Sequence, residues 1–279
     1  MIKKLCLISI VGFTLQAQNS VHLDVVMDKN RFLEGEPIFL GILLSNPGPA
    51  DIEIPRPSVS AGSLALLIQD DKGAKLKYRG KVITGLGDSK TTLKANGEIY
   101  MMEEITMSFG RLFSASALGR FLEPGAYKLH VRFHYAGSEV ASETQDFLVV
   151  PPEGVEKDIY ELFRSTLTNV SYGRADVGQA ASTLLSFHSS YPNSPYTPLA
   201  LSILPGWYEY RLGNASKASL VEKIIAHEYS ASGKAQPFIK KILTETASRQ
   251  DRIDLLTALI ARTQGSVINK VMVKLLEKE

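Results

Sequence analysis

A histidine followed by a glutamate, His227-Glu228, begins like the zinc-peptidase motif H-E-x-x-H. In that motif two imidazoles one helical turn apart bind the same zinc ion, and the glutamate acts as the general base. The second histidine would stand at position 231, which is Ala231. Because one of the two imidazoles is missing, we expect no metal site here.

Three other histidines, His130, His134 and His188, are candidates because imidazole side chains can bind metals or transfer protons. His130 and His134 share one face of a predicted strand, but their Cα atoms are roughly 13 Å apart at about 3.3 Å per residue, too far for one ion. We therefore expect a solvated face there. His188 continues the apolar stripe of Leu184 and Leu185 on a predicted helix, which favours a hydrogen-bonded core histidine over a catalytic one.

Motifs for nucleophiles and phosphates are also incomplete. The stretch 85–90, GLGDSK, lacks the Walker spacing and is followed by no helical pattern, so we interpret it as a loop between strands. No serine stands in G-x-S-x-G or precedes a lysine as S-x-x-K. A triad dispersed along the sequence stays open, because triads form in space. We predict no catalytic residues, no metal and no cofactor, and hence no enzyme.

The best candidates for a binding surface are the aromatic and basic residues Trp207, Tyr208, Tyr210 and Arg211. Aromatic side chains and arginine anchor many protein interfaces. On an ideal helix Trp207 continues an apolar stripe and Tyr210 lies at its margin. We therefore predict binding through Trp207, Tyr210 and Arg211, with Tyr210 the more exposed of the two aromatic residues.

The first 18 residues have the pattern of a secretory signal peptide, with cleavage near Ala17. Lys3 and Lys4 form the charged start, and the apolar run that follows is too short to span a bilayer. The leader contains Cys6, the only cysteine, so the mature chain forms no disulfide. We expect a periplasmic or secreted protein with no transmembrane segment once the leader is removed.

The balance of charged residues argues against one class of partner. The chain has 31 basic and 29 acidic residues, and removal of Lys3 and Lys4 makes the two counts equal. This balance lacks the basic excess that nucleic-acid binding usually requires, so we expect no nucleic-acid partner.

Residues 19–152 read as strands. Between 127 and 135 apolar residues occupy every second position, and Ala136-Gly137-Ser138 supplies a turn to a return strand that ends at Pro151-Pro152. Further strands are predicted at 21–27, 38–44, 52–54, 63–69, 75–78 and 98–109. Seven to nine strands at this spacing predict an antiparallel β-sandwich.

Residues 153–279 read as helices. Apolar residues recur there every third or fourth position in at least five stretches, which is the pattern of amphipathic helices. We predict about seven helices packed as antiparallel pairs. The chain is therefore expected to comprise a leader (1–18), a β-domain (19–152) and an α-helical domain (153–279).

The pieces LEGEPIFLGILLSNPG, LIQDDKGAKLKYRG and FLEPGAYKLHV resemble bacterial immunoglobulin-like domains. The resemblance implies that Tyr127 is a corner tyrosine whose hydroxyl bonds to nearby backbone. The order of the pieces is also similar to the β-domain that precedes the catalytic domain in some secreted zinc peptidases.

The stretch 191–229 resembles a tetratricopeptide repeat of the kind found in cell-envelope proteins. The resemblance places Gly213 at the turn, Gly206 at the small position of the first helix and Ala218 at that of the second, where close helix packing needs small residues. Pro205 and Glu209 depart from the pattern, and Pro205 would kink the first helix.

From these observations we expect an exported, non-catalytic protein that contacts a protein partner of the cell envelope, as an interaction or scaffold module. One alternative is an accessory protein or inhibitor of a secreted peptidase, acting through the β-domain. The other is a hydrolase with a dispersed triad between the two domains.

Overall fold

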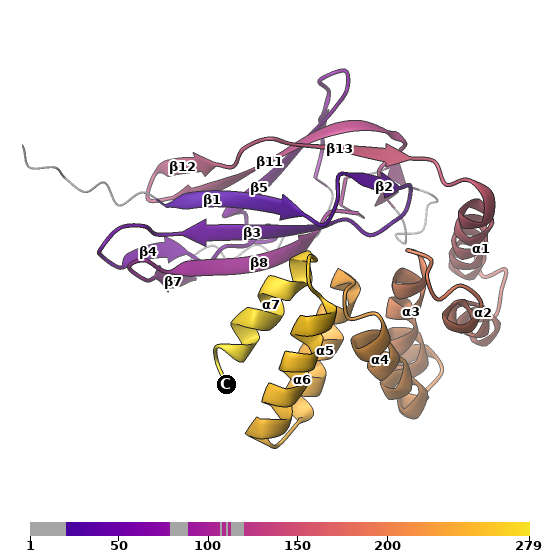
Figure 1. Cartoon of the computed structure of the whole chain (residues 1–279). Helices are drawn as coiled ribbons and strands as arrows, with labels where there is room; N and C mark the ends of the chain where they lie inside the picture. Colours follow the sequence, from indigo (N-terminus) through magenta and orange to yellow (C-terminus); the bar gives the residue numbers. More distant parts are fainter. Residues whose placement is uncertain (1–20, 79–88, 107, 110, 113–119) are drawn as a thin grey trace, which may run out of the picture.

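The structure is a computed structural model, and it describes residues 21–78, 89–106, 108–109, 111–112 and 120–279. Strands occupy the chain up to Val150 and helices begin at Gly154, which confirms the predicted change from strands to helices (Figure 1). The predicted leader, with Cys6 and Ala17, and most of the predicted loop at 85–90 lie outside the described residues.

One antiparallel sheet has the order β1-β3-β8, formed by β1 (His22–Met27), β3 (Phe39–Ser45) and β8 (Glu98–Glu104). The segment after β3 also pairs with the segment before β8, as β4 (Ile52–Pro55) and β7 (Lys90–Leu93). The Asn46 side chain stabilises the bend between the two pairings, because its amide donates to the carbonyl oxygens of Leu93 and Lys94.

The second, larger sheet has the order β2-β13-β11-β5-β6. Its strands are β2 (Arg31–Leu33), β5 (Leu64–Asp70), β6 (Lys75–Leu76), β11 (Gly125–Tyr135) and β13 (Gln145–Val150), with β12 (Ser138–Ala141) paired to one end of β11. β9 (Arg111–Leu112) and β10 (Arg120–Phe121) form a short separate pair. The sheet departs from the antiparallel expectation in one place, because β2 pairs with β13 in parallel.

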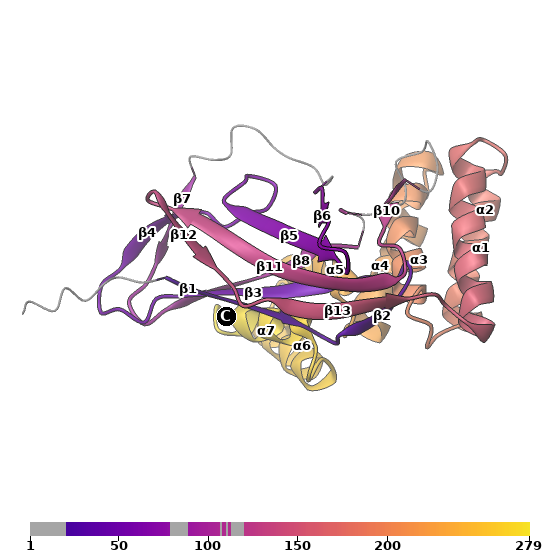
Figure 2. The ribbon, with the colours of Figure 1, turned by 90° about the horizontal axis from the view of Figure 1, so that it is seen from above.

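The two sheets share one hydrophobic core. In β11 the alternating residues Tyr127, Leu129, Val131 and Phe133 are buried, as the period of two predicts. They pack with buried residues of both sheets, including Leu40, Ile42 and Leu44 of β3. Seen from above, β11 and β5 cross over β3 and β8 (Figure 2).

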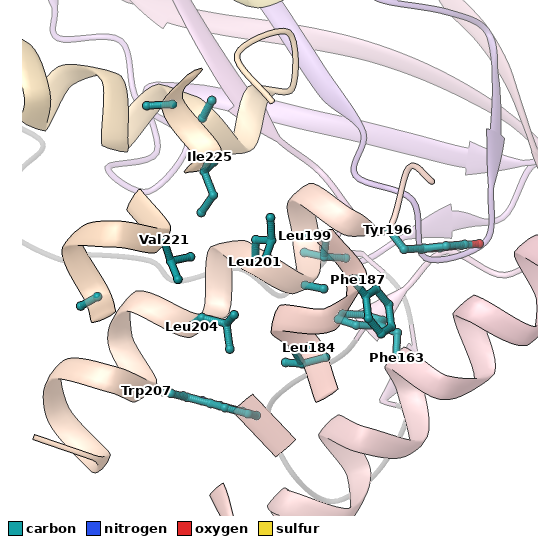
Figure 3. Packing of buried hydrophobic residues seen from close by; sticks show 14 of the residues in the cluster. Phe163, Leu184, Phe187, Tyr196, Leu199, Leu201, Leu204, Trp207, Val221 and Ile225 are labelled. Atoms are coloured by element: carbon teal, nitrogen blue, oxygen red, sulfur yellow. The ribbon is translucent and has the colours of Figure 1, made fainter. Parts of the chain in front are cut away.

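The helical half contains α1 (Gly154–Ser171), α2 (Val177–Ser190), α3 (Thr197–Gly206), α4 (Ala215–Glu228), α5 (Gln236–Glu245), α6 (Arg249–Arg262) and α7 (Val267–Leu276). Neighbouring helices from α1 to α5 contact one another in sequence order, as do α6 and α7. Their apolar stripes meet in a second core that contains Phe163, Leu184, Phe187, Leu199 and Leu204 (Figure 3).

The Glu34-Gly35-Glu36 turn of the strand half is held by two tyrosines of the helical half. Tyr196 Oη donates to the Glu34 carbonyl oxygen at 2.7 Å, and Tyr160 Oη donates to Glu34 Oε1 at 3.0 Å. Burial raises the pKa of both tyrosines, so both hydroxyls stay protonated donors. Gly35 has a φ of +80°, and a Cβ there would lie 2.5 Å from the Tyr160 ring. Glycine is therefore required at this contact.

Removal of the Tyr196 hydroxyl tests this contact. Tyr196→Phe is expected to lower the free energy of unfolding by about 1 kcal/mol, because the Glu34 carbonyl loses its donor in a buried setting. Urea unfolding followed by circular dichroism measures the change. Tyr172→Phe, at an exposed tyrosine, is the matched control, and an equal effect of both substitutions would contradict the prediction.

A second contact joins the start of α7 to the sheet β1-β3-β8. Tyr100 Oη of β8 donates to the Val267 carbonyl oxygen at 2.7 Å, and the Asp28 carboxylate accepts the Val267 N–H. Gly41 of β3 leaves room for the tyrosine, since a Cβ there would lie 2.1 Å from Tyr100 Oη. The helices α5 and α7 thus lie along the side of β8 away from the strand core (Figure 1).

Candidate functional site

The predicted binding residues lie on an irregular turn that follows α3. Pro205 has no N–H to continue the hydrogen-bond ladder of α3, and the next residues, Trp207–Arg211, form one turn of π-helix. The turn closes with a bond from Leu212 N–H to the Trp207 carbonyl oxygen at 3.0 Å. The kink expected at Pro205 therefore takes the form of a widened helical turn.

The π-helix divides the predicted residues between core and surface. Trp207 is 8% exposed and Tyr208 is 4% exposed, and both belong to the helical core. Tyr210 is 82% exposed and Arg211 is also exposed. The expected margin position of Tyr210 is thus a surface position, whereas Tyr208, expected in the surface cluster, is a core residue. The i→i+5 bonding of a π-helix changes the spacing of side chains from that of an ideal α-helix, which accounts for the burial of Tyr208 next to Trp207.

Further aromatic and basic side chains lie on the neighbouring α1–α2 turn. The Arg174 guanidinium stacks on the exposed Tyr172 ring at 5.1 Å from its centroid. A Cβ on Gly178, at the start of α2, would lie 3.9 Å from a methyl carbon of Leu212, so this turn and the π-helix are adjacent. We call the exposed residues Tyr172, Arg174, Tyr210, Arg211 and Leu212 the aromatic tip.

The aromatic tip lies at the end of the helices remote from the strands. In Figure 3 Trp207, which begins the π-helix, lies farthest from the strands along the row of labelled core residues. Beneath the tip, Lys217 lies over the Tyr208 ring at 5.7 Å, and the Asn214 N–H donates to the Tyr208 carbonyl oxygen at 2.7 Å. The tip therefore rests on ordered, well-packed residues, which reduces the entropy lost on binding.

The sequence predicts structural roles for four residues, Tyr127, Gly206, Gly213 and Ala218. Tyr127 Oη donates to the Glu123 carbonyl oxygen at 2.7 Å, the nearby backbone contact that the sequence predicts. Gly213 has a φ of +61° in the turn before α4, and Ala218 is buried on α4. Gly206 does not fit its expected role, because a Cβ there would meet nothing within 4 Å. The close helix approach expected at Gly206 is absent.

The side chains of His188 and His134 make structural contacts. His188 Nδ1 lies 3.1 Å from Tyr229 Oη and its Nε2 lies 3.7 Å from Glu228 Oε2, so it is hydrogen-bonded at the edge of the helical core. His134 Nδ1 lies 3.4 Å from Glu139, and neither set of contacts includes a serine. Burial, and then the nearby Arg132, lower the pKa of His130.

In the described parts of the chain no three histidine, cysteine, aspartate or glutamate side chains gather as ligands for a metal ion. Among the same residues no helix has both the length and the apolar composition needed to cross a bilayer.

Comparison with protein families finds no match for this sequence, and comparison with curated proteins finds none either. Among solved structures, the sporulation control protein Spo0M of Bacillus subtilis is 11% identical over 54% of this chain and 55% of its own, with a TM-score of 0.30. The alkylpurine DNA glycosylase AlkC of Pseudomonas fluorescens is 17% identical over 46% of this chain, with a TM-score of 0.28, and only 30% of its length is covered. A CARDB domain from Pyrococcus furiosus is 8% identical over 48% of this chain and 94% of its own, with a TM-score of 0.28.

Proposed function

We propose that this chain is an exported binding protein that contacts a protein partner of the cell envelope through its aromatic tip. The observation that carries the proposal is the exposure of Tyr210, with Arg211 beside it, on a turn whose other two aromatic side chains are buried. Tyrosine and arginine bury large areas at protein interfaces and hydrogen-bond at the same time. The leader pattern supports export to the periplasm or the cell surface.

The two halves take different parts in this proposal. We propose that the strand half is an immunoglobulin-like domain and that the helical half is related to tetratricopeptide repeats. The strand half then serves as a support, because Tyr160 and Tyr196 fix the first helices against the Glu34 turn. The tip follows the C-terminal ends of α1 and α3, whereas Tyr160 and Tyr196 lie near their N-terminal ends.

The test uses the mature protein, residues 19–279, as bait for an envelope extract. A captured protein is then purified and titrated against the unmodified chain and against a Tyr210→Ala, Arg211→Ala double variant. We expect the double variant to bind at least tenfold more weakly, because it removes two exposed anchors of the tip.

Val155→Ala is the matched control, since Val155 is 67% exposed at the start of α1, at the end of the helical half near the strands. Its affinity should equal that of the unmodified chain. Equal affinity of the double variant would contradict the proposal. Hydrolysis of peptide, ester or glycan substrates by the mature protein, lost on substitution of one polar cleft, would contradict the non-catalytic assignment.

A further inference from the structure

A hollow of about 230 Å³ lies where β8 meets α5 and α7, away from the aromatic tip. Its lining comes from three elements that are far apart in the sequence. The lining residues are Tyr100, Met101 and Met102 of β8, Gln236 and Lys240 of α5, and Val271, Lys274, Leu275 and Lys278 from α7 and the residues after it.

The hollow carries unpaired positive charge. Among the described residues, no carboxylate lies within ion-pair distance of the Lys240 or Lys278 ammonium group. Burial, and then the neighbouring Lys278, lower the pKa of Lys240, as expected when two like charges face one site. Lys274 is already paired, because Glu277 lies 3.1 Å from its ammonium group. An anion placed between Lys240 and Lys278 would relieve their repulsion.

The walls beside these two lysines are apolar and adaptable. Val271 is buried, and Met102 and Leu275 are half-buried against the helical core. Methionine side chains adjust to ligands of irregular shape. A second hollow of about 320 Å³ shares Met102 and Gln236 with the first, but the Lys234–Glu104 ion pair lines it together with Phe39 and Phe238, so it is not an apolar extension of the first. The apolar part of a ligand with an anionic head would therefore lie against Met102, Val271 and Leu275 in the first hollow.

We propose that the hollow between β8, α5 and α7 binds an amphipathic carboxylate, with its head between Lys240 and Lys278 and its apolar part against Met102, Val271 and Leu275. Lysine ammonium groups act as point charges that need no fixed bidentate geometry, and a carboxylate between two of them offsets one of the two positive charges. The chemistry is shared by a fatty acid and by the free C-terminus of a peptide that ends in apolar residues.

The test measures binding of octanoate and of octan-1-ol to the mature chain by isothermal titration calorimetry. We expect octanoate to bind at least tenfold more tightly than the alcohol, because the two molecules differ in the charged head. A Lys240→Met, Lys278→Met double variant should lose at least tenfold in affinity for octanoate. Lys72→Met, at an exposed turn lysine of the strand half, should leave it unchanged.

Two peptides that end in Leu-Leu, one with a free carboxylate and one amidated, distinguish a fatty acid from a peptide C-terminus as the ligand. Tighter binding of the free peptide than of octanoate, lost on amidation, assigns the site to a peptide C-terminus. Tighter binding of octanoate assigns it to a fatty acid. Equal binding of octanoate and octanol to the unmodified chain, or an unchanged affinity in the Lys240→Met, Lys278→Met variant, would overturn the proposal. So would the absence of binding by both octanoate and the free peptide at millimolar concentration.

Discussion

Replacing Phe187 with alanine is expected to lower the free energy of unfolding by about 3–5 kcal/mol. Phe187 is completely buried on α2, in the core that also receives Phe163, Leu184 and Leu199 (Figure 3). Truncation removes a large apolar side chain and leaves a cavity that the surrounding helices fill only in part. Domains are commonly stable by about 5–15 kcal/mol, so the loss is a large share of the total.

Urea unfolding followed by far-UV circular dichroism measures this loss. Val155→Ala provides the control, because truncation of an exposed side chain should change the free energy of unfolding by less than about 0.5 kcal/mol. A loss below about 1 kcal/mol for Phe187→Ala would show that α2 does not pack into the helical core as described.

Replacing Gly233 with alanine is expected to destabilise the chain by about 1–3 kcal/mol. Gly233 begins the short 3-10 turn before α5, and a Cβ there would lie 2.5 Å from carbons of the Phe39 ring of β3. Phe39 is buried and its clashing atoms include the carbon that joins the ring to its own Cβ, so the ring has little room to move. The substitution therefore strains the contact between the helical half and β3.

Gly206→Ala is the matched control for this substitution. Gly206 has an ordinary helical φ of −64° and open space around its Cβ position, so alanine should stabilise the chain by up to about 1 kcal/mol through its higher helix propensity. Opposite signs for the two glycine substitutions, measured as shifts in the urea midpoint, are the expected result. Destabilisation of similar size at both positions would contradict the packing at both sites.

Sequence patterns predicted the elements whose side chains repeat along the chain. The alternation from Tyr127 to Phe133 predicted the buried face of β11, and the apolar stripe that contains Leu184 and Leu185 predicted α2. Pro205 predicted an irregularity at the end of α3, which is the π-helix. These features depend on neighbours within a few residues, and for that reason the sequence alone indicates them.

Features that depend on distant contacts were not predicted. Strand β2 has only three residues and owes its place to a parallel pairing with β13, more than a hundred residues later. Tyr208 is buried because the π-helix changes the helical spacing, which an ideal helix does not show. The lysines at 270, 274 and 278 repeat every four residues, but Lys240 joins Lys278 only when α5 and α7 meet beside β8.

The claim that the aromatic tip is the partner surface is tested most directly by site-specific photo-crosslinking in cells. A photoreactive phenylalanine analogue replaces Tyr210 in one strain and Val155 in another, both exposed positions on the helical half. We expect one discrete covalent adduct from position 210 and none from position 155. An adduct from position 155 with none from position 210 would contradict it.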